Sequence, residues 1–420
     1  MLLGVGGGTA WVVSGGFGAD SGSGGGGGSA AAEPKEWAVP FVNADSSNFD
    51  ASIGFGTWMS DSAAIRAQKD GVLAYDLKTG KRAWGVPSPT DNLCGATSEI
   101  EGGLGAIAYG TEAACDHLAG IDVKTGKLTW KIKIPAEPKS RLTMNVPTLL
   151  LAGDVVIAKV GNSVYAYGLA DGKKLWGGSP ADGCRPDGLG GSAEQLVVTV
   201  DCGVGSHVSG LDPKTGKPKW RSEIAAEGLS HLVLSAKPAV VATTSGDSTT
   251  VEVVDESGKA RQFVAGERID LLALNGENFT DGEYERYRVA LHGNTLYLAT
   301  FPENVPGKLR SRDYALAYDM TTGKRLWKST GTNDTMLSYV RADDHGLLAL
   351  ETGDRRDLAP RLVRIDAATG KATALAELPQ KYGHEGEKAR VFEKNGAVVI
   401  MPPKAVAADY AVVSVRTAAQ

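Results

Sequence analysis

The chain has 420 residues and carries 44 Lys and Arg against 49 Asp and Glu, a net charge of −5. This length suits two or three ordinary domains or one large repeat architecture. No segment concentrates Lys and Arg into a basic stripe, which argues against nucleic acid as a partner.

The first 34 residues differ in composition from the rest. Residues 1–17 are apolar but interrupted by glycines, and they fall short of the ~20 apolar residues that a membrane-spanning helix needs. No Lys or Arg precedes Lys35, so the basic start of a secretory signal is missing. We expect the end of a truncated membrane span or a weak export signal, with a disordered cytoplasmic tail as the third interpretation. Residues 18–34 are rich in Gly, Ser and Ala and are predicted to link this segment flexibly to a domain formed by residues 35–420.

One short motif recurs along the chain. Its six clearest copies are AYDLKTGKRAW (74–84), GIDVKTGKLTW (120–130), AYGLADGKKLW (166–176), GLDPKTGKPKW (210–220), AYDMTTGKRLW (317–327) and RIDAATGKATA (364–374). A seventh copy, VVDESGKARQF (253–263), is one residue shorter. The aligned positions, which are Asp in all copies but the third, are separated by 46, 46, 44, 43, 64 and 47 residues. A period of about 45 residues predicts the four-stranded blade of a β-propeller.

The chemistry of the motif predicts a β-hairpin. An alternating run leads into Asp-x-x-Thr-Gly-Lys, and a second run ends in an aromatic residue in six of the seven copies. Asp accepts hydrogen bonds from backbone N–H groups further on, and Gly adopts the positive φ of such a turn. The residue two before the Asp position is small in five copies, which leaves room for a large side chain from a neighbouring sheet. We therefore predict that the terminal aromatic residues dock one blade on another: Trp84, Trp130, Trp176, Trp220, Phe263, Trp327 and, from the closing strand, Trp37.

The two ends of the chain complete one blade. Residues 389–417 contain three more alternating runs but no Gly-Lys turn and no Trp. The missing outer strand is supplied by residues 36–41 (EWAVPF), which carry Trp37. The sequence therefore predicts an all-β fold: an eight-bladed β-propeller of four-stranded antiparallel blades, with the ring closed by the N-terminal strand. Six or seven blades are the alternative if the copy at Asp255 is degenerate.

Four cysteines occupy nearly equivalent places in two copies of the repeat. Cys94 and Cys115 fall within one predicted blade, and Cys184 and Cys202 fall within another. We predict the disulfides Cys94–Cys115 and Cys184–Cys202, which mark an oxidising compartment. The alternatives are free buried cysteines and a zinc site of four thiolates, although no CxxC pair occurs.

The hairpins resemble the PQQ-like repeats of quinoprotein-type propellers, through Ala-x-Asp, Thr-Gly-Lys and Leu-Trp, over residues 36–417. That wider family includes PQQ-dependent alcohol dehydrogenases, an eight-bladed outer-membrane assembly lipoprotein and extracytoplasmic propellers of actinobacterial membrane proteins, among them sensor domains of receptor-like Ser/Thr kinases. The Gly-rich linker is most similar to the last group. The resemblance implies an extracytoplasmic protein, at the cell surface or anchored to the membrane.

The resemblance leaves an enzyme and a binding module to be compared. A PQQ-dependent dehydrogenase needs Ca²⁺ on oxygen ligands, a catalytic Asp and stacking aromatic residues. Its relatives also use adjacent cysteines, which this sequence lacks, and no GxSxG or kinase catalytic-loop motif occurs. His117 and His207 each lie five residues before the aligned Asp position, and this repetition favours a structural role over a metal site. We predict a non-catalytic binding, sensing or scaffolding module with no cofactor, and keep a PQQ/Ca-dependent dehydrogenase or a degenerate PQQ-binding relative as the alternative.

The long interval between Asp255 and Asp319 is the best candidate for partner binding. It leaves room for extended loops in residues 277–288 and 301–313. Aromatic and guanidinium groups are enriched in protein contacts, so the predicted contact residues are Tyr284, Arg286, Tyr287 and Arg288. The alternative is a tolerated surface insertion. We expect a monomeric propeller that binds a protein, peptide or envelope component and is held at the membrane through its N-terminus.

Overall fold

The structure is a computed structural model that describes residues 35–41, 54–111, 114–135, 146–181, 183–203, 205–224, 230–245, 248–265, 267–270, 288–354, 356–386, 389–402 and 408–417. The predicted anchor and linker, residues 1–34, lie outside these ranges and stay predictions. Within these ranges, no helix has the length and apolar character needed to cross a membrane.

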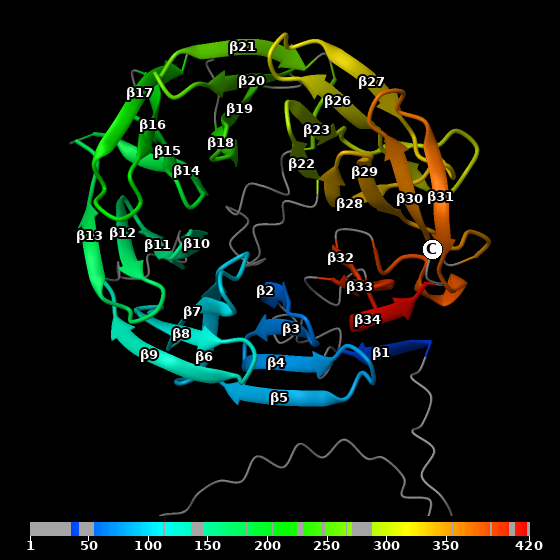
Figure 1. Cartoon of the computed structure of the whole chain (residues 1–420), viewed down its shortest axis with the longest axis horizontal. Coiled ribbons are helices and arrows are strands. Elements are labelled where there is room, and N and C mark those ends of the chain that lie inside the picture. The colour runs from blue at the N-terminus through cyan, green and yellow to red at the C-terminus, as the bar shows by residue number, and fades with distance from the viewer. Residues whose placement is uncertain are drawn as a thin grey trace, which may run out of the picture. The chain divides into compact units, whose positions relative to one another are not determined.

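The described chain forms eight four-stranded antiparallel sheets arranged as the blades of a ring (Figure 1). Seven blades follow the chain in order: β2 (Gly54–Met59), β3 (Ala63–Gln68), β4 (Gly71–Asp76), β5 (Arg82–Pro87); β6 (Asn92–Ala96), β7 (Leu104–Gly110), β8 (His117–Asp122), β9 (Lys127–Lys133); β10 (Thr148–Ala152), β11 (Val155–Val160), β12 (Ser163–Gly168), β13 (Lys174–Gly178); β14 (Arg185–Gly191), β15 (Leu196–Asp201), β16 (Ser206–Leu211), β17 (Pro218–Ile224); β18 (Ser230–Ser235), β19 (Ala239–Ser245), β20 (Ser248–Val254), β21 (Ala260–Ala265); β22 (Val289–His292), β23 (Thr295–Ala299), β26 (Ala315–Asp319), β27 (Arg325–Ser329); and β28 (Leu337–Asp343), β29 (Gly346–Glu351), β30 (Arg361–Asp366), β31 (Ala372–Glu377).

The eighth blade joins the two ends of the propeller. It contains β32 (Arg390–Lys394), β33 (Ala397–Met401) and β34 (Tyr410–Arg416), and β1 (Glu36–Pro40) adds the outer strand by antiparallel pairing with β34. Trp37 lies opposite Ser414 in this pairing. The copy of the motif at Asp255 forms a full blade, β18 to β21. The predicted fold class, blade number and closure are confirmed, and the alternatives of six or seven blades are wrong.

Burial follows the position of a strand within its blade. Middle strands such as β29 and β33 are buried at every residue, because both faces of each sheet pack against neighbouring blades. The outermost strand β9 alternates exposed and half-buried residues, with Lys127, Lys131 and Lys133 on its exposed side. Lysines on an outer edge discourage pairing with another chain.

The terminal Trp of the motif lies against the Gly of the next blade's turn. A Cβ on Gly172 (φ +69°) would come within 2.6 Å of the Trp130 ring, whose Nε1 donates a hydrogen bond to the Leu169 carbonyl at 2.8 Å. The same arrangement recurs for Trp37 and Gly80, Trp84 and Gly126, Trp176 and Gly216, Phe263 and Gly323, and Trp327 and Gly370. Gly is therefore required here both for its backbone angle and for the space that it leaves.

The small residue two before the Asp position makes room for the Trp of its own blade. A Cβ on Gly120 would meet the ring of Trp130, and one on Gly210 would meet Trp220, each from the adjacent strand of the same sheet. The expectation that this space receives a side chain from a neighbouring sheet is wrong at these two positions. The Trp is wide enough to cover the Gly of its own strand pair and still reach the next blade.

Strand direction divides the loops between two faces of the ring. Because the strands alternate in direction, the loops between second and third strands share one face with the connections from blade to blade. We call this the connector face; its described loops include residues 300–314, 330–336, 379–386 and 408–409. The Asp-x-x-Thr-Gly-Lys turns lie on the opposite face.

Candidate functional site

The sixth blade carries an extra hairpin on the connector face. Residues 300–314, which join β23 to β26, include the short strands β24 (Glu303–Asn304) and β25 (Ser311–Arg312). This β24–β25 hairpin (residues 303–312) explains part of the long interval between the motif copies at Asp255 and Asp319. Residues 271–287, including Tyr284, Arg286 and Tyr287, lie outside the described residues, so their predicted role in partner binding stays a prediction.

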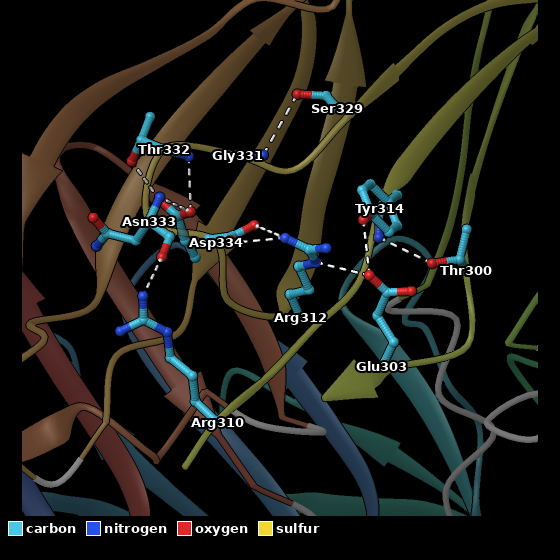
Figure 2. A network of polar contacts seen from close by, with 11 residues as sticks. Thr300, Glu303, Arg310, Arg312, Tyr314, Ser329, Gly331, Thr332, Asn333 and Asp334 are labelled. Atoms are coloured by element: carbon cyan, nitrogen blue, oxygen red, sulfur yellow. Dashed lines mark hydrogen bonds and ion pairs between the residues drawn. The ribbon is translucent and has the colours of Figure 1, made fainter. Parts of the chain in front are cut away.

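Arg312 fastens the hairpin to the connection between the sixth and seventh blades (Figure 2). Its Nη1 lies 2.8 and 2.9 Å from the two carboxylate oxygens of Asp334, and its Nε donates to Glu303 at 2.8 Å. The Tyr314 hydroxyl donates to the same Glu303 oxygen at 2.8 Å. The hydrogen bond from Arg312 lowers the pKa of Glu303, with that from Tyr314 acting in the same direction. The Arg312 guanidinium thus links the two strands of the hairpin to each other and to the connector.

The connector that pairs with Arg312, residues 330–336, is itself held by a buried carboxylate. The Glu351 side chain is buried at the end of β29 and accepts hydrogen bonds from the backbone N–H of Thr332, at 2.7 Å, and of Asn333. Burial raises the pKa of Glu351, and the hydrogen bonds of Thr332 and Asn333 oppose that rise. Arg310 donates to the Asn333 carbonyl at 3.3 Å (Figure 2). Arg310 and Arg312, both on the second arm of the hairpin, therefore contact an ordered connector.

The tip of the hairpin is apolar and exposed. Leu309 is 90% exposed, the highest value among the large apolar side chains in the described residues, whereas Val305 is buried beneath the turn. The turn is closed by hydrogen bonds from Val305 N–H to the Arg310 carbonyl, at 3.0 Å, and from Lys308 N–H to the Val305 carbonyl, at 3.1 Å. A loop whose base is held by hydrogen bonds loses little conformational entropy if it binds a partner.

A buried ionic cluster begins at Asp313, the residue that follows the hairpin, and includes Arg288 and Asp270. Asp313 is fully buried, forms an ion pair with Arg288 and accepts the backbone N–H of Leu337 at 3.0 Å. Arg288 also lies 3.2 Å from Asp270. Burial raises the pKa of Asp313 to about 6, against the opposing charge of Arg288. The expectation that Arg288 contacts a partner is wrong, because its side chain is 1% exposed and neutralises interior carboxylates.

A cavity of about 390 Å³ is lined mainly by residues of the first strands of three blades, β22, β28 and β32. Tyr339, Arg341, Arg390 and Phe392 contribute to its wall, and Glu99 is the sole carboxylate among its described lining residues. Arg341 is paired with Glu393 at 2.6 Å, and the Arg390 guanidinium stacks on the Phe392 ring at 5.1 Å. A calcium-bound quinone needs several oxygen ligands around the ion. The lining residues that the structure describes therefore offer too few oxygen ligands for calcium-bound PQQ.

The cysteine predictions are confirmed. Cys94 is bonded to Cys115 within the second blade, and Cys184 is bonded to Cys202 within the fourth. Both bridges lie at the connector-face ends of their blades. They close loops of 21 and 18 residues, and such bridges persist in oxidising compartments.

Comparison with known proteins identifies the family. The model of the family described as "Outer membrane protein assembly factor BamB" matches residues 59–188, 160–267 and 189–373. The chain belongs to this family. No curated protein matches it.

Two of the matching solved structures share the fold of this BamB-family chain, and a third falls below a TM-score of 0.5. The computationally designed Ika8 protein has a TM-score of 0.57 and 12% identity, covering 87% of this chain and 97% of its own. The quinohemoprotein alcohol dehydrogenase ADHIIG from Pseudomonas putida HK5 has a TM-score of 0.53 and 13% identity, covering 92% and 77%. BamB from Moraxella catarrhalis has a TM-score of 0.48 and 15% identity, covering 91% and 96%. At these identities the likeness shows the fold alone.

Proposed function

We propose that this chain is a non-catalytic propeller that works outside the cytoplasm and binds a protein or peptide of the cell envelope through the β24–β25 hairpin. The observation that carries the proposal is the hairpin itself, which combines an exposed Leu309 with a base held by Arg312 and Asp334. Interfaces obtain much of their affinity from a few side chains, and a pre-organised support lowers the entropy cost of binding.

Two further findings support an envelope partner. The matching family is named for an outer membrane protein assembly factor, and a factor that assembles proteins must contact them. The two disulfides suit an oxidising compartment outside the cytoplasm. In this proposal the ring is a monomer held near the membrane by residues 1–34, and the hairpin carries the specificity.

Site-specific photo-crosslinking tests the proposal. A photoreactive residue placed at Leu309 is expected to give one saturable adduct with an envelope protein. The matched control is the same residue at Val264, which is 59% exposed on the outer strand β21, away from the hairpin. Equal adduct patterns at the two positions would show that exposure alone, and not the hairpin, determines capture.

A second pair of variants tests the support beneath the hairpin. Arg312→Ala removes the contacts to Asp334 and Glu303 and is expected to lower partner affinity at least ~10-fold, because the hairpin must then be ordered on binding. Arg325→Ala is the control, since Arg325 forms an exposed ion pair with Glu267 at 2.9 Å on the outer strand β27. Equal affinities for the two variants would contradict the proposed role.

A further inference from the structure

Three potential metal ligands from two separate segments meet where the ring closes. His384 and Glu385 lie in the connection from β31 to β32, just after the 3₁₀ turn η3 (Gln380–Tyr382), and Asp409 immediately precedes β34. Their ligand atoms all lie within 4.8 Å of one another. Glu385 is fully buried, His384 is 14% exposed and Asp409 is 63% exposed. Solvent therefore reaches this cluster mainly at Asp409.

The spacing of these atoms fits a shared metal ion as well as an ion pair. Nε2 of His384 lies 3.2 Å from Glu385 Oε1 and 3.4 Å from Asp409 Oδ2. Charge-assisted N–H···O bonds are shorter, at about 2.7–2.9 Å, and one Nε2–H has a single proton for two acceptors. Two ligands bound tetrahedrally to zinc at 2.0–2.1 Å stand about 3.4 Å apart, which matches both distances.

The buried carboxylate is held in place by the backbone. Glu385 Oε1 accepts the backbone N–H of Asp409 at 3.0 Å, and Oε2 accepts that of Tyr410 at 3.4 Å. These bonds fix the carboxylate and bring Asp409 up to the imidazole. Hydrogen bonds to a ligating carboxylate orient it and raise the affinity of a metal site.

From this geometry we propose that His384, Glu385 and Asp409 bind a divalent first-row transition metal, with Zn²⁺ as the best match. One imidazole and two carboxylates suit such an ion, and a water molecule completes four-fold coordination. Two of the three protein ligands are carboxylates, and the ion neutralises their charge, including that of the fully buried Glu385. Mg²⁺ suits the set poorly, because it prefers octahedral oxygen ligands.

The role of this metal is to fasten the closing seam, which we define as residues 35–41, 379–386 and 408–417. Lys381 already forms an ion pair with Glu36 of β1, and Phe41 N–H donates to the Asp409 carbonyl. The metal adds a bond between the last connector and the blade that holds both chain ends. Metal binding to the folded ring therefore stabilises it against opening at this seam.

Calorimetric titration of the tag-free full chain with Zn²⁺ tests the proposal. We expect one equivalent to bind with a Kd below about 10 µM, and 100 Kd of Zn²⁺ to raise Tm by at least about 3 °C. Co²⁺ in place of Zn²⁺ is expected to give the visible absorption of a four-coordinate ion. Mg²⁺ at the same concentration is expected to change neither signal.

Substitutions test whether the Zn²⁺ binding comes from His384, Glu385 and Asp409. Asp409→Asn is expected to weaken Zn²⁺ binding at least about 10-fold while leaving the buried Glu385 and the apo fold intact, and His384→Ala to weaken it about 100-fold. The matched control is His292→Ala, because His292 pairs with one carboxylate, Asp344, at 2.8 Å, and no third potential ligand among the described residues joins them. Failure of Zn²⁺ to bind below 1 mM, or equal affinity for the His384 and His292 variants, would overturn the assignment. Neither result would bear on partner binding by the hairpin.

Discussion

The contact between Trp130 and Gly172 predicts an unusually costly glycine substitution. Gly172→Ala places a Cβ at φ +69°, which costs about 1–2 kcal/mol for any residue other than Gly. The same Cβ would stand 2.6 Å from Cε3 of Trp130, and overpacking of this kind costs about 1–3 kcal/mol more. We expect the free energy of unfolding to fall by about 2–5 kcal/mol in total.

A second glycine separates the two contributions. Gly203 has nearly the same backbone angle, φ +75°, but no atom lies within 4 Å of the position that its Cβ would take. Gly203→Ala is therefore expected to cost only the backbone part, about 1–2 kcal/mol. Urea titration followed by circular dichroism measures both variants, and the difference of about 1–3 kcal/mol between them isolates the packing against the Trp.

A double-mutant cycle tests the cause of that difference. When Trp130 is replaced by Ala, the extra cost of Gly172→Ala should disappear, so that both glycine variants then cost the same within about 0.5 kcal/mol. Trp130→Phe provides a milder background if the Ala variant folds poorly. The reasoning is refuted if Gly172→Ala costs no more than Gly203→Ala in the wild-type background, or if the extra cost persists without the indole.

Three other predictions concern the disulfides, acid stability and the cofactor. Replacing Cys184 and Cys202 with Ser should lower the unfolding free energy by about 3 kcal/mol, measured by urea titration; equal stability of the reduced wild type and the oxidised one would contradict this. Hydrogen bonds from the Thr215 hydroxyl and backbone lower the pKa of Asp212 below its ordinary 3.8, so its charged form stabilises the fold above pH 4 and that contribution is lost as the pH falls further. Thr215→Val should therefore flatten the fall in urea midpoint between pH 4 and 3, and an unchanged slope would argue against it. PQQ with Ca²⁺ should neither raise Tm nor support dye-linked alcohol oxidation, whereas turnover would establish the dehydrogenase alternative.

The sequence alone determined the ring, because the features that build a blade are local. Alternation within each strand and the Asp-to-Gly turn repeat about every 45 residues, so the number and order of the blades are written along the chain. The strand with Trp37 completes a blade that lacks its outer strand, which made the closure predictable. The equivalent places of Cys94 and Cys115 and of the second cysteine pair made both disulfides predictable for the same reason.

The tertiary structure decided the contacts between segments that share no repeat. The interval before Asp319 indicated an insertion, but the pairing of Arg312 with Asp334 depends on how two connections meet on one face of the ring. Arg288 is polar, and only the packing around Asp313 shows that its charge is buried and compensated. His384 and Asp409 are 25 residues apart with no metal-binding spacing between them. They come together because closing the ring brings the last connector against the final blade, a geometric constraint that no local pattern of residues encodes.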